Sequence, residues 1–231
     1  MPRKQFLLRH LRATAGVIVV VTGLVACGGG DAEAPLSFGA ASARSAAPVA
    51  AESGPTPNEL SGDEIAGLKF MREEEKLAHD VYVAMSALWA HRTFDNIAQS
   101  ETEHTEAVLA MLTKNGIEDP AANKPAGLFE NPDLQAMYDA LVTTGRASLV
   151  AGLKVGALIE ETDIRDIEGM KAVTDEADIL RVYDSLLCGS RNHLRAFNNA
   201  LLGQGVVYVS QVIQQQEWDA IAQSPSETCG P

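Results

Sequence analysis

The stretch MREEEKLAHDVY, Met71–Tyr82, places three glutamates in a row inside a segment whose apolar residues recur at helical spacing. The recurring stripe advances in steps of three and four and consists of Leu68, Met71, Glu75, Ala78, Tyr82, Met85 and Trp89. Such a stripe forms one face of an amphipathic helix that packs against a core. Because Glu75 is in register with the stripe, the pattern predicts that one carboxylate of this helix points inward.

The two preceding glutamates leave an alternative open. We expect Glu73 to be solvated and Glu74 to lie at the boundary between surface and core. Glu74, however, has apolar neighbours of its own at helical spacing, among them Leu77 and Val81. The sequence therefore does not decide whether Glu74 or Glu75 is the inward carboxylate.

Three further stretches repeat the helical pattern, and local connections join them. The four long helices are expected at about 61–91, 93–115, 148–172 and 175–202, within a bundle domain at 61–203. A shorter helix is expected at 134–145, after a loop rich in proline and glycine. Residues 204–231 form a C-terminal extension. With almost no strand signal, the pattern predicts an all-α fold, a helical bundle with an extra short helix between its second and third long helices.

Each of the four predicted stripes carries a residue near its middle that can bind a metal. These residues are Glu75, Glu101 with His104, Glu160, and His193. Residues three apart are neighbours on a helix surface, so Glu101 and His104 project side by side. A lone buried carboxylate is costly unless it is paired or bound to a metal, so the four helices predict a shared site for one or two cations. Carboxylate oxygens with imidazole favour iron or manganese.

Two alternatives remain open at this point. If the third long helix is rotated, Glu161 replaces Glu160 as the inward residue. Arg191 and Arg195 could also neutralise the glutamates without a metal, and the polar centre would then be a salt-bridge network in a structural adaptor. Taken alone, a histidine such as His193 is more often a hydrogen-bonded core histidine than a metal ligand.

Five segments carry a resemblance to a known family. They are MREEEKLAHDVY, NIAQSETEH, GLFENPDLQAMYDAL, LKVGALIEETDI and GSRNHLRAF. In this order, over about 64–201, they resemble the bacterial and archaeal ferritin-like family catalogued as domain of unknown function 2202. The resemblance implies a ferritin-like four-helix bundle, in which two helices give one glutamate each and two give Glu-x-x-His. This chain departs from that layout because Ser190 stands three residues before His193. Asp163, one turn after Glu160, could supply the missing carboxylate, so an open or asymmetric site is expected.

The candidate site favours an exported ferritin-like protein whose metal ions react with oxygen or peroxide. Tyr82, two turns from Glu75, would be a hydrogen-bonding residue beside the ligands or a redox-active phenol. The alternative, which is slightly favoured, is a core tyrosine with a satisfied hydroxyl. The alternatives are a metal-binding protein without turnover and a structural adaptor of the cell envelope. The sequence decides neither whether the protein is an enzyme, nor its substrate, nor its oligomeric state.

Residues 1–26 predict an export signal, with a basic start followed by 14 apolar residues, ATAGVIVVVTGLVA. A membrane span needs about 17–25 apolar residues, so this stretch favours a signal peptide. The following LVAC resembles a bacterial lipobox, which predicts that Cys27 is lipidated and anchors the protein at the periplasmic side of a membrane. Gly28 follows the cysteine, which favours the outer membrane. Residues 27–60, rich in Gly, Ala, Ser and Pro, predict a flexible tether.

The net charge bears on the expected partners, and the two remaining cysteines bear on a possible disulfide. The chain holds 31 Asp and Glu against 18 Lys and Arg, a net charge of −13, so nucleic acid is not expected as a partner. Cys188 and Cys229 could form a disulfide in an oxidising compartment. The alternative is that Cys188 is a small buried residue and Cys229 belongs to a loose tail.

Overall fold

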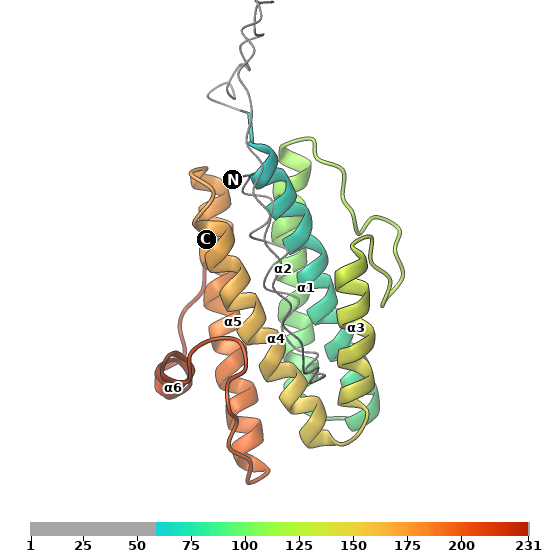
Figure 1. Ribbon diagram of the computed structural model, residues 1–231, viewed down its shortest axis with the longest axis vertical. Coiled ribbons are helices and arrows are strands. Elements are labelled where there is room, and N and C mark those ends of the chain that lie inside the picture. The colour runs from blue at the N-terminus through green and yellow to red at the C-terminus, as the bar shows by residue number, and fades with distance from the viewer. Residues whose placement is uncertain (1–58, 231) are drawn as a thin grey trace, which may run out of the picture. The chain divides into compact units, whose positions relative to one another are not determined.

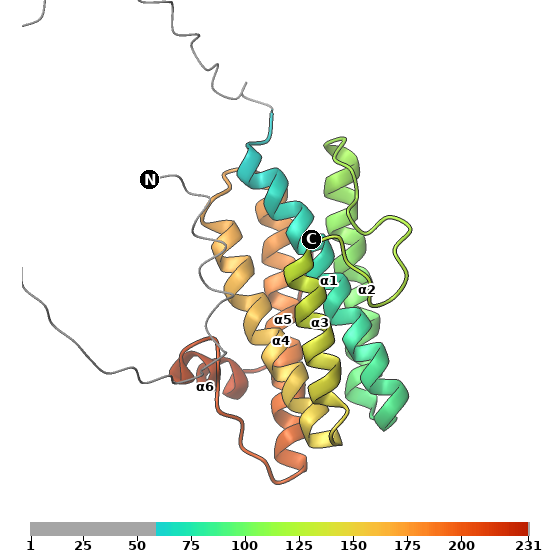
Figure 2. The same ribbon diagram turned by 45° about the vertical axis from the view of Figure 1, so that its right-hand side comes forward.

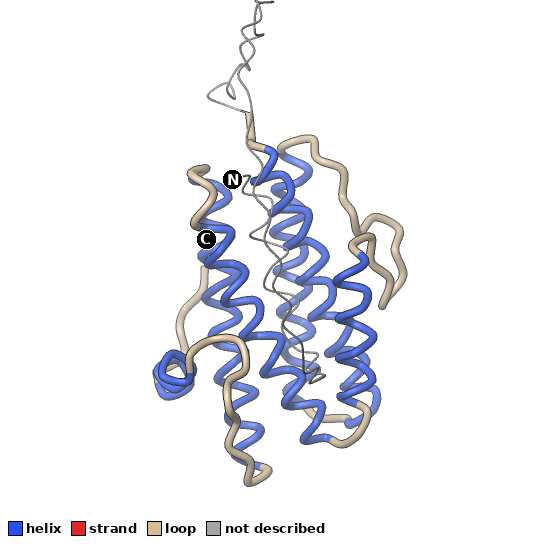
Figure 3. The backbone as a smooth tube through the Cα atoms, viewed as in Figure 1, coloured by secondary structure: helices blue, strands red, loops and turns tan. Residues whose placement is uncertain are grey.

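The computed structural model describes residues 59–230, which form six helices and no strand. The helices are α1 (Gly62–Trp89), α2 (Arg92–Lys114), α3 (Pro132–Gly145), α4 (Leu149–Lys171), α5 (Ala177–Gly203) and α6 (Gln215–Gln223). The long helices α1, α2, α4 and α5 lie side by side (Figure 1 and Figure 2). Figure 3 shows the loops that join them. The predicted all-α fold is confirmed.

The helix ends follow local signals in the sequence. Ser61 and Glu64 form a capping box at the start of α1, with nitrogen-to-oxygen distances of 2.8 and 3.2 Å. Gly116 has a φ of 64°, which suits the left-handed turn that ends α2. α2 begins slightly earlier than predicted because the His91 side chain caps it by accepting from Thr93 N–H.

The core lies between the four long helices, with α3 packed against α1 and α4 and α6 packed against α5. The apolar members of the α1 stripe are fully buried, except for Trp89 at the helix end. Near the middle of the bundle, Tyr82 stacks on Phe197 of α5 with ring centroids 5.2 Å apart. The period-3.6 pattern therefore identified the inner face of α1.

Glu73 was expected in solvent, and this prediction is wrong. Its side chain is buried and accepts hydrogen bonds from the backbone N–H groups of Glu130 and Asn131, the second at 3.0 Å. The loop 115–131 covers this side of α1, and its buried N–H groups need acceptors. Asp80 has the same role two turns later, since it accepts from Gly127 N–H at 2.8 Å.

The C-terminal extension packs on α4 and α5. The buried carboxylate of Glu161 accepts hydrogen bonds from three successive backbone N–H groups, those of Gln211, Val212 and Ile213. Farther along, Cys229 is joined to Cys188 of α5 by a disulfide, with their Cα atoms 5.7 Å apart. The extension is therefore an ordered part of the fold.

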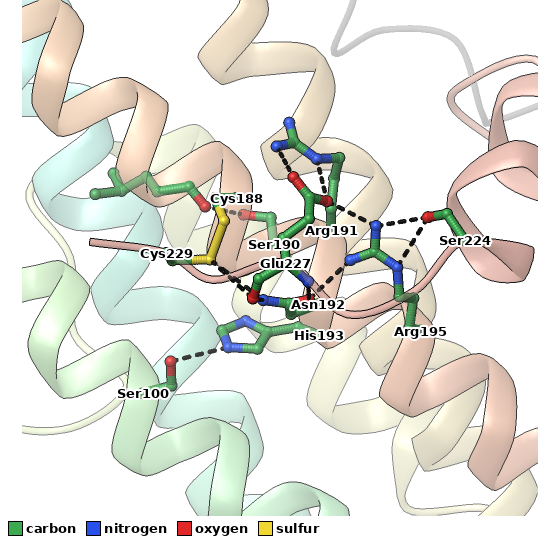
Figure 4. The surroundings of a disulfide bond; sticks show 11 residues. Ser100, Cys188, Ser190, Arg191, Asn192, His193, Arg195, Ser224, Glu227 and Cys229 are labelled. Atoms are coloured by element: carbon green, nitrogen blue, oxygen red, sulfur yellow. Dashed lines mark hydrogen bonds and ion pairs between the residues drawn. A yellow bond between two sulfur atoms is a disulfide. The ribbon is translucent and has the colours of Figure 1, made fainter. Parts of the chain in front are cut away.

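Beside the disulfide, two arginines of α5 hold the last residues of the chain (Figure 4). Arg191 forms two hydrogen bonds with Glu227, one of them at 2.8 Å, and Arg195 donates to the same carboxylate at 2.6 Å. Asn192 also binds the backbone carbonyl of Glu227 at 3.0 Å.

Replacing Cys229 by serine is expected to lower the free energy of unfolding by about 2–4 kcal/mol, because the disulfide closes a loop with a sequence separation of 41 in the unfolded chain. The measurement is urea unfolding without reductant, with Ser226→Ala in the same exposed tail as the control. Reduction of the wild-type protein should reproduce the loss. Equal stability of the oxidised wild type, the reduced wild type and Cys229→Ser would show that the disulfide does not stabilise the fold.

Several predictions from the N-terminal part lie outside the described residues: the signal peptide at 1–26, lipidation of Cys27 and nearly all of the tether at 27–60. The described residues, 59–230, belong to one compact unit. Among the helices of residues 59–230, none combines the length and apolar character that a membrane span requires.

Candidate metal centre

Five predicted ligands converge in the middle of the bundle, and we call them the central cluster: Glu75 of α1, Glu101 and His104 of α2, Glu160 of α4 and His193 of α5. The three glutamates are fully buried, and the two histidines are 8% and 7% exposed. One atom each of Glu101, His104 and His193 can be chosen so that all lie within 4.8 Å of one another.

Glu101 lies at the centre of this cluster. Its Oε2 atom is 2.8 Å from Nδ1 of His104, and its Oε1 atom is 2.9 Å from Nδ1 of His193. The outer carboxylates approach the same nitrogens: Glu75 Oε2 lies 3.2 Å from His104, and Glu160 Oε2 lies 3.5 Å from His193. The ring centroids of the two histidines are 5.4 Å apart. All four long helices therefore contribute to one polar centre.

A glycine on α5 makes room for one of the rings. A Cβ atom at Gly189 would lie 2.3 Å from Nε2 and 2.5 Å from Cε1 of His104. Any larger residue would require the imidazole to move. Gly189 is one turn before His193, so the same face of α5 supplies one ligand and admits another.

Two hydroxyl groups hold cluster members in place from outside. The Tyr82 hydroxyl donates to Glu160 Oε1 at 2.5 Å, and Ser100 Oγ lies 2.9 Å from Nε2 of His193 (Figure 4). Hydrogen bonds to the far side of a ligand fix its orientation, and metal sites depend on them. Because Ser100 contacts Nε2 of His193, the Nδ1 atom of the same ring faces Glu101.

The charges of the cluster stabilise one another in the absence of a metal. Burial would raise the pKa of Glu101, but the charges on His193 and His104 outweigh it and hold that pKa well below its usual range. Burial lowers the pKa of His193, whereas Glu101 and Glu160 raise it, with a net result of about 10. Burial raises the pKa of Glu75 to about 7, against the opposing charge of His104.

The donor atoms fit a transition-metal ion. Within the described part of the chain, four buried cluster atoms have no hydrogen-bond partner: Glu75 Oε1, Glu101 Oε1, Glu160 Oε2 and His193 Nδ1. Glu101 Oε1 and His193 Nδ1 are close but lack hydrogen-bond geometry. Buried polar atoms are normally satisfied, so unpaired oxygens and an imidazole nitrogen at one point match the ligands of iron, manganese or zinc.

The structure separates the alternatives that the sequence left open. Glu75 contacts His104, whereas Glu74 is buried beside the cluster and has no hydrogen-bond partner in the described chain. Glu160 faces the cluster, whereas Glu161 binds the C-terminal extension. The predicted extra carboxylate, Asp163, is buried and also lacks a hydrogen-bond partner among residues 59–230.

Two other expectations are corrected or refined. Arg191 and Arg195 do not neutralise the central glutamates, because both bind Glu227 of the tail. Ser190, which stands where a fourth glutamate was expected, donates its hydroxyl to the carbonyl of Leu186 at 3.1 Å. The centre is asymmetric in this respect.

Sequence reasoning missed the roles of Gly189 and Ser100. Gly189 lies one turn before His193, but its significance depends on a ring from another helix. Ser100 precedes Glu101 in the chain and carried no signal of its contact with α5. Both contacts are tertiary and have no local pattern.

Comparisons with known proteins find similarity over most of the described part of the chain. Residues 64–225 match a family model described as an uncharacterized protein domain, DUF2202. The uncharacterized protein MJ0754 of Methanocaldococcus jannaschii is 45% identical over 168 residues, which cover 73% of this chain and 91% of that protein. The crystal structure of hypothetical protein MJ0754 is similar with a TM-score of 0.72 and 44% identity, covering 76% of this chain and 100% of that chain.

Proposed function

We propose that this chain, which belongs to the DUF2202 family, binds one or two iron or manganese ions at the central cluster within a ferritin-like four-helix bundle. The observation that carries the proposal is the convergence of carboxylate and imidazole atoms from four helices, several of them without hydrogen-bond partners in the described chain. Ion binding would satisfy these atoms and offset the cost of burying three carboxylates.

The proposed reactivity is with dioxygen or peroxide. A bound iron or manganese ion would supply the electron exchange. The protein's residues would fix the ligands: Tyr82 orients Glu160, and Ser100 orients His193. Because Ser190 bonds to its own helix, one side of the centre lacks a carboxylate and would be the open side for a small molecule.

The first experiment measures metal binding. Purified protein is stripped with a chelator, reloaded anaerobically with Fe²⁺ or Mn²⁺, and the bound ions are counted by elemental analysis. We expect one or two ions in the wild type and a loss of binding in His193→Gln. Failure of the wild type to retain any ion would refute the proposal. Oxygen and peroxide consumption by the iron-loaded protein then tests turnover, and no consumption would favour metal binding without catalysis.

Metal affinity is expected to rise with pH. The raised pKa of His193, about 10, means that its imidazole is protonated at neutral pH in the metal-free protein, so an ion must displace that proton. Each released proton makes the affinity rise about tenfold per pH unit. Titrations with Mn²⁺ at pH 6, 7 and 8 test this, and a pH-independent affinity would contradict it.

A structural role without metal is the second candidate, and one observation favours it. Glu101 already faces both histidines, so the cluster has an internal ion-pair network. In that case the chelator-treated protein would be as stable as the untreated protein, and added Mn²⁺ would not raise its melting temperature. Metal binding predicts a stabilisation that grows with ion concentration.

We also propose that the protein is exported and anchored at the periplasmic face of a membrane through a lipid on Cys27, with the outer membrane favoured. The sequence of residues 1–27 motivates this, and the Cys188–Cys229 disulfide supports an oxidising compartment. Cys27→Ser is expected to abolish incorporation of labelled palmitate and release the protein from membranes. Incorporation that persists in this variant would contradict the anchor site.

A further inference from the structure

Two buried acidic residues next to the central cluster receive no hydrogen bond from any donor in the described part of the chain. Glu74 of α1 and Asp163 of α4 are 2% and 1% exposed. All four of their carboxylate oxygens lack a hydrogen-bond partner within residues 59–230. They belong to two helices that pack against each other.

Other buried acids of this fold show what is unusual here. Glu73 and Glu161 accept backbone N–H groups of loops, and Asp80 accepts from both Gly127 N–H and the ammonium group of Lys76. Burial of a carboxylate is thus ordinary in this protein when a donor is supplied. Glu74 and Asp163 are buried without one, and such a burial requires neutralisation by another route.

Arg165, a cationic side chain that acts electrostatically on both carboxylates, is already engaged. Arg165 forms two hydrogen bonds with Asp166, at 2.7 and 2.8 Å. Burial, followed by the charges of Asp166 and Glu75, raises the pKa of Glu74 well above its usual range, and Arg165 only partly opposes this. For Asp163 the charge that contributes most after burial is that of Glu74. The geometric basis for pairing these two residues is that both side chains are almost fully buried, have no hydrogen-bond partner within residues 59–230, and belong to helices α1 and α4, which pack together.

The acidic residues of α4 form a row that leads outward. Glu160, Asp163 and Asp166 follow one another at intervals of three, so each is a surface neighbour of the next. The row turns by about 60° around the helix and rises about 4.5 Å per step along its axis. Glu160 is fully buried, Asp163 almost so, and the side chain of Asp166 is 19% exposed. The row connects the central cluster with solvent.

We propose that Glu74 and Asp163 form a second cation site, made only of oxygen ligands, with Asp166 at its solvent end. Oxygen-only sites prefer hard divalent ions, so the occupant would be Mn²⁺ or Fe²⁺ on its way to the central cluster. This destination rests on the proposed function. The site itself is distinct because it contains no imidazole.

The experiment counts ions in the full-length protein. Free Mn²⁺ is followed by electron paramagnetic resonance during titration, and Co²⁺ absorption reports imidazole coordination at the central cluster. The variant Glu74→Gln with Asp163→Asn keeps the shape of both side chains and removes their charge. Its control is Glu168→Gln, an exposed acid of the same helix. We expect the double variant to bind one Mn²⁺ fewer than the control, with an unchanged Co²⁺ spectrum.

A second variant keeps the test decisive if the double variant does not fold. Asp166→Asn changes a partly exposed side chain and is expected to slow Mn²⁺ uptake about tenfold or more, since it removes charge from the entrance. An equal Mn²⁺ count in the double variant and the control, as a pair of carboxyl groups sharing a proton would give, would overturn the second site. Loss of the Co²⁺ spectrum together with the missing ion would also overturn it, because the two sites would then be one. Absence of all ions in the wild type would instead defeat the proposed function.

Discussion

Replacing Glu101 by glutamine is expected to lower the free energy of unfolding of the metal-free protein by about 3–5 kcal/mol near pH 6. Glu101 lies between two buried imidazoles, 2.8 Å from His104 and 2.9 Å from His193. The amide keeps the size of the side chain but removes its charge, so two histidines would remain buried without their shared partner. Leaving a buried charge unpaired is among the costliest single changes in a folded protein.

The pH dependence of this loss has a definite sign. The pKa of His193 rises from 6.5 to about 10 on folding, so the pair contributes fully below pH 6.5 and is lost as the pH rises through 10. The pKa of Glu101 falls on folding from 4.5, so its contribution is present above pH 4.5 and is lost in acid. The effect of the substitution should therefore be largest at about pH 5–6 and smallest above pH 10.

Urea unfolding in the presence of a chelator measures this effect. Glu103→Gln, an exposed glutamate of the same helix, is the matched control and should change the stability by less than about 0.5 kcal/mol. A loss below about 1 kcal/mol for Glu101→Gln would be typical of a surface ion pair and would contradict the described network.

Replacing Gly189 by alanine is expected to weaken Mn²⁺ binding by at least about 100-fold, although this residue carries no ligand. The new methyl group would lie 2.3 Å from His104 Nε2, so the imidazole would have to leave its position beside Glu101. Metal affinity typically falls about 10–100-fold when a residue that only supports a ligand is removed. Displacement of the ligand itself should therefore lower the affinity by about 100-fold or more. Overpacking should also cost about 1–3 kcal/mol of stability.

The control for this variant is Gly169→Ala, on α4. A Cβ atom there meets nothing within 4 Å, so the substitution should leave metal affinity unchanged and slightly stabilise the helix. Titration of both variants with Mn²⁺ gives the comparison. Equal affinities for Gly189→Ala and Gly169→Ala would show that the position of His104 does not matter for binding.

The helices and the convergence of five side chains could be predicted because both depend on local periodicity. The stripe through Met71, Glu75 and Tyr82 identifies an inner face whatever the helix packs against. Likewise, Glu101 and His104 project together because they are three residues apart on one helix. Such information is contained in a short window of sequence.

What could not be predicted depends on partners far along the chain. Glu73 is buried because backbone N–H groups of the loop 115–131 need an acceptor, and nothing near Glu73 indicates that loop's position. The sequence left the pairing of Cys188 with Cys229 open, because these residues are 41 positions apart and only the packed tail brings them together. The significance of Gly189 depends on a ring from α2. In each case the role of the residue depends on a contact with a part of the chain that is distant in sequence.

The most direct test of the metal centre is anomalous diffraction from crystals of the protein grown with Mn²⁺. The account predicts an anomalous peak in the middle of the bundle, bounded by Glu101, His104 and His193, with Mn–ligand distances of about 2.0–2.3 Å. The same crystals of His193→Gln should show this peak weakened or lost. A wild-type crystal grown with Mn²⁺ that shows no anomalous density at that point, with Glu101 still lying between His104 and His193 and no ion among them, would contradict the account.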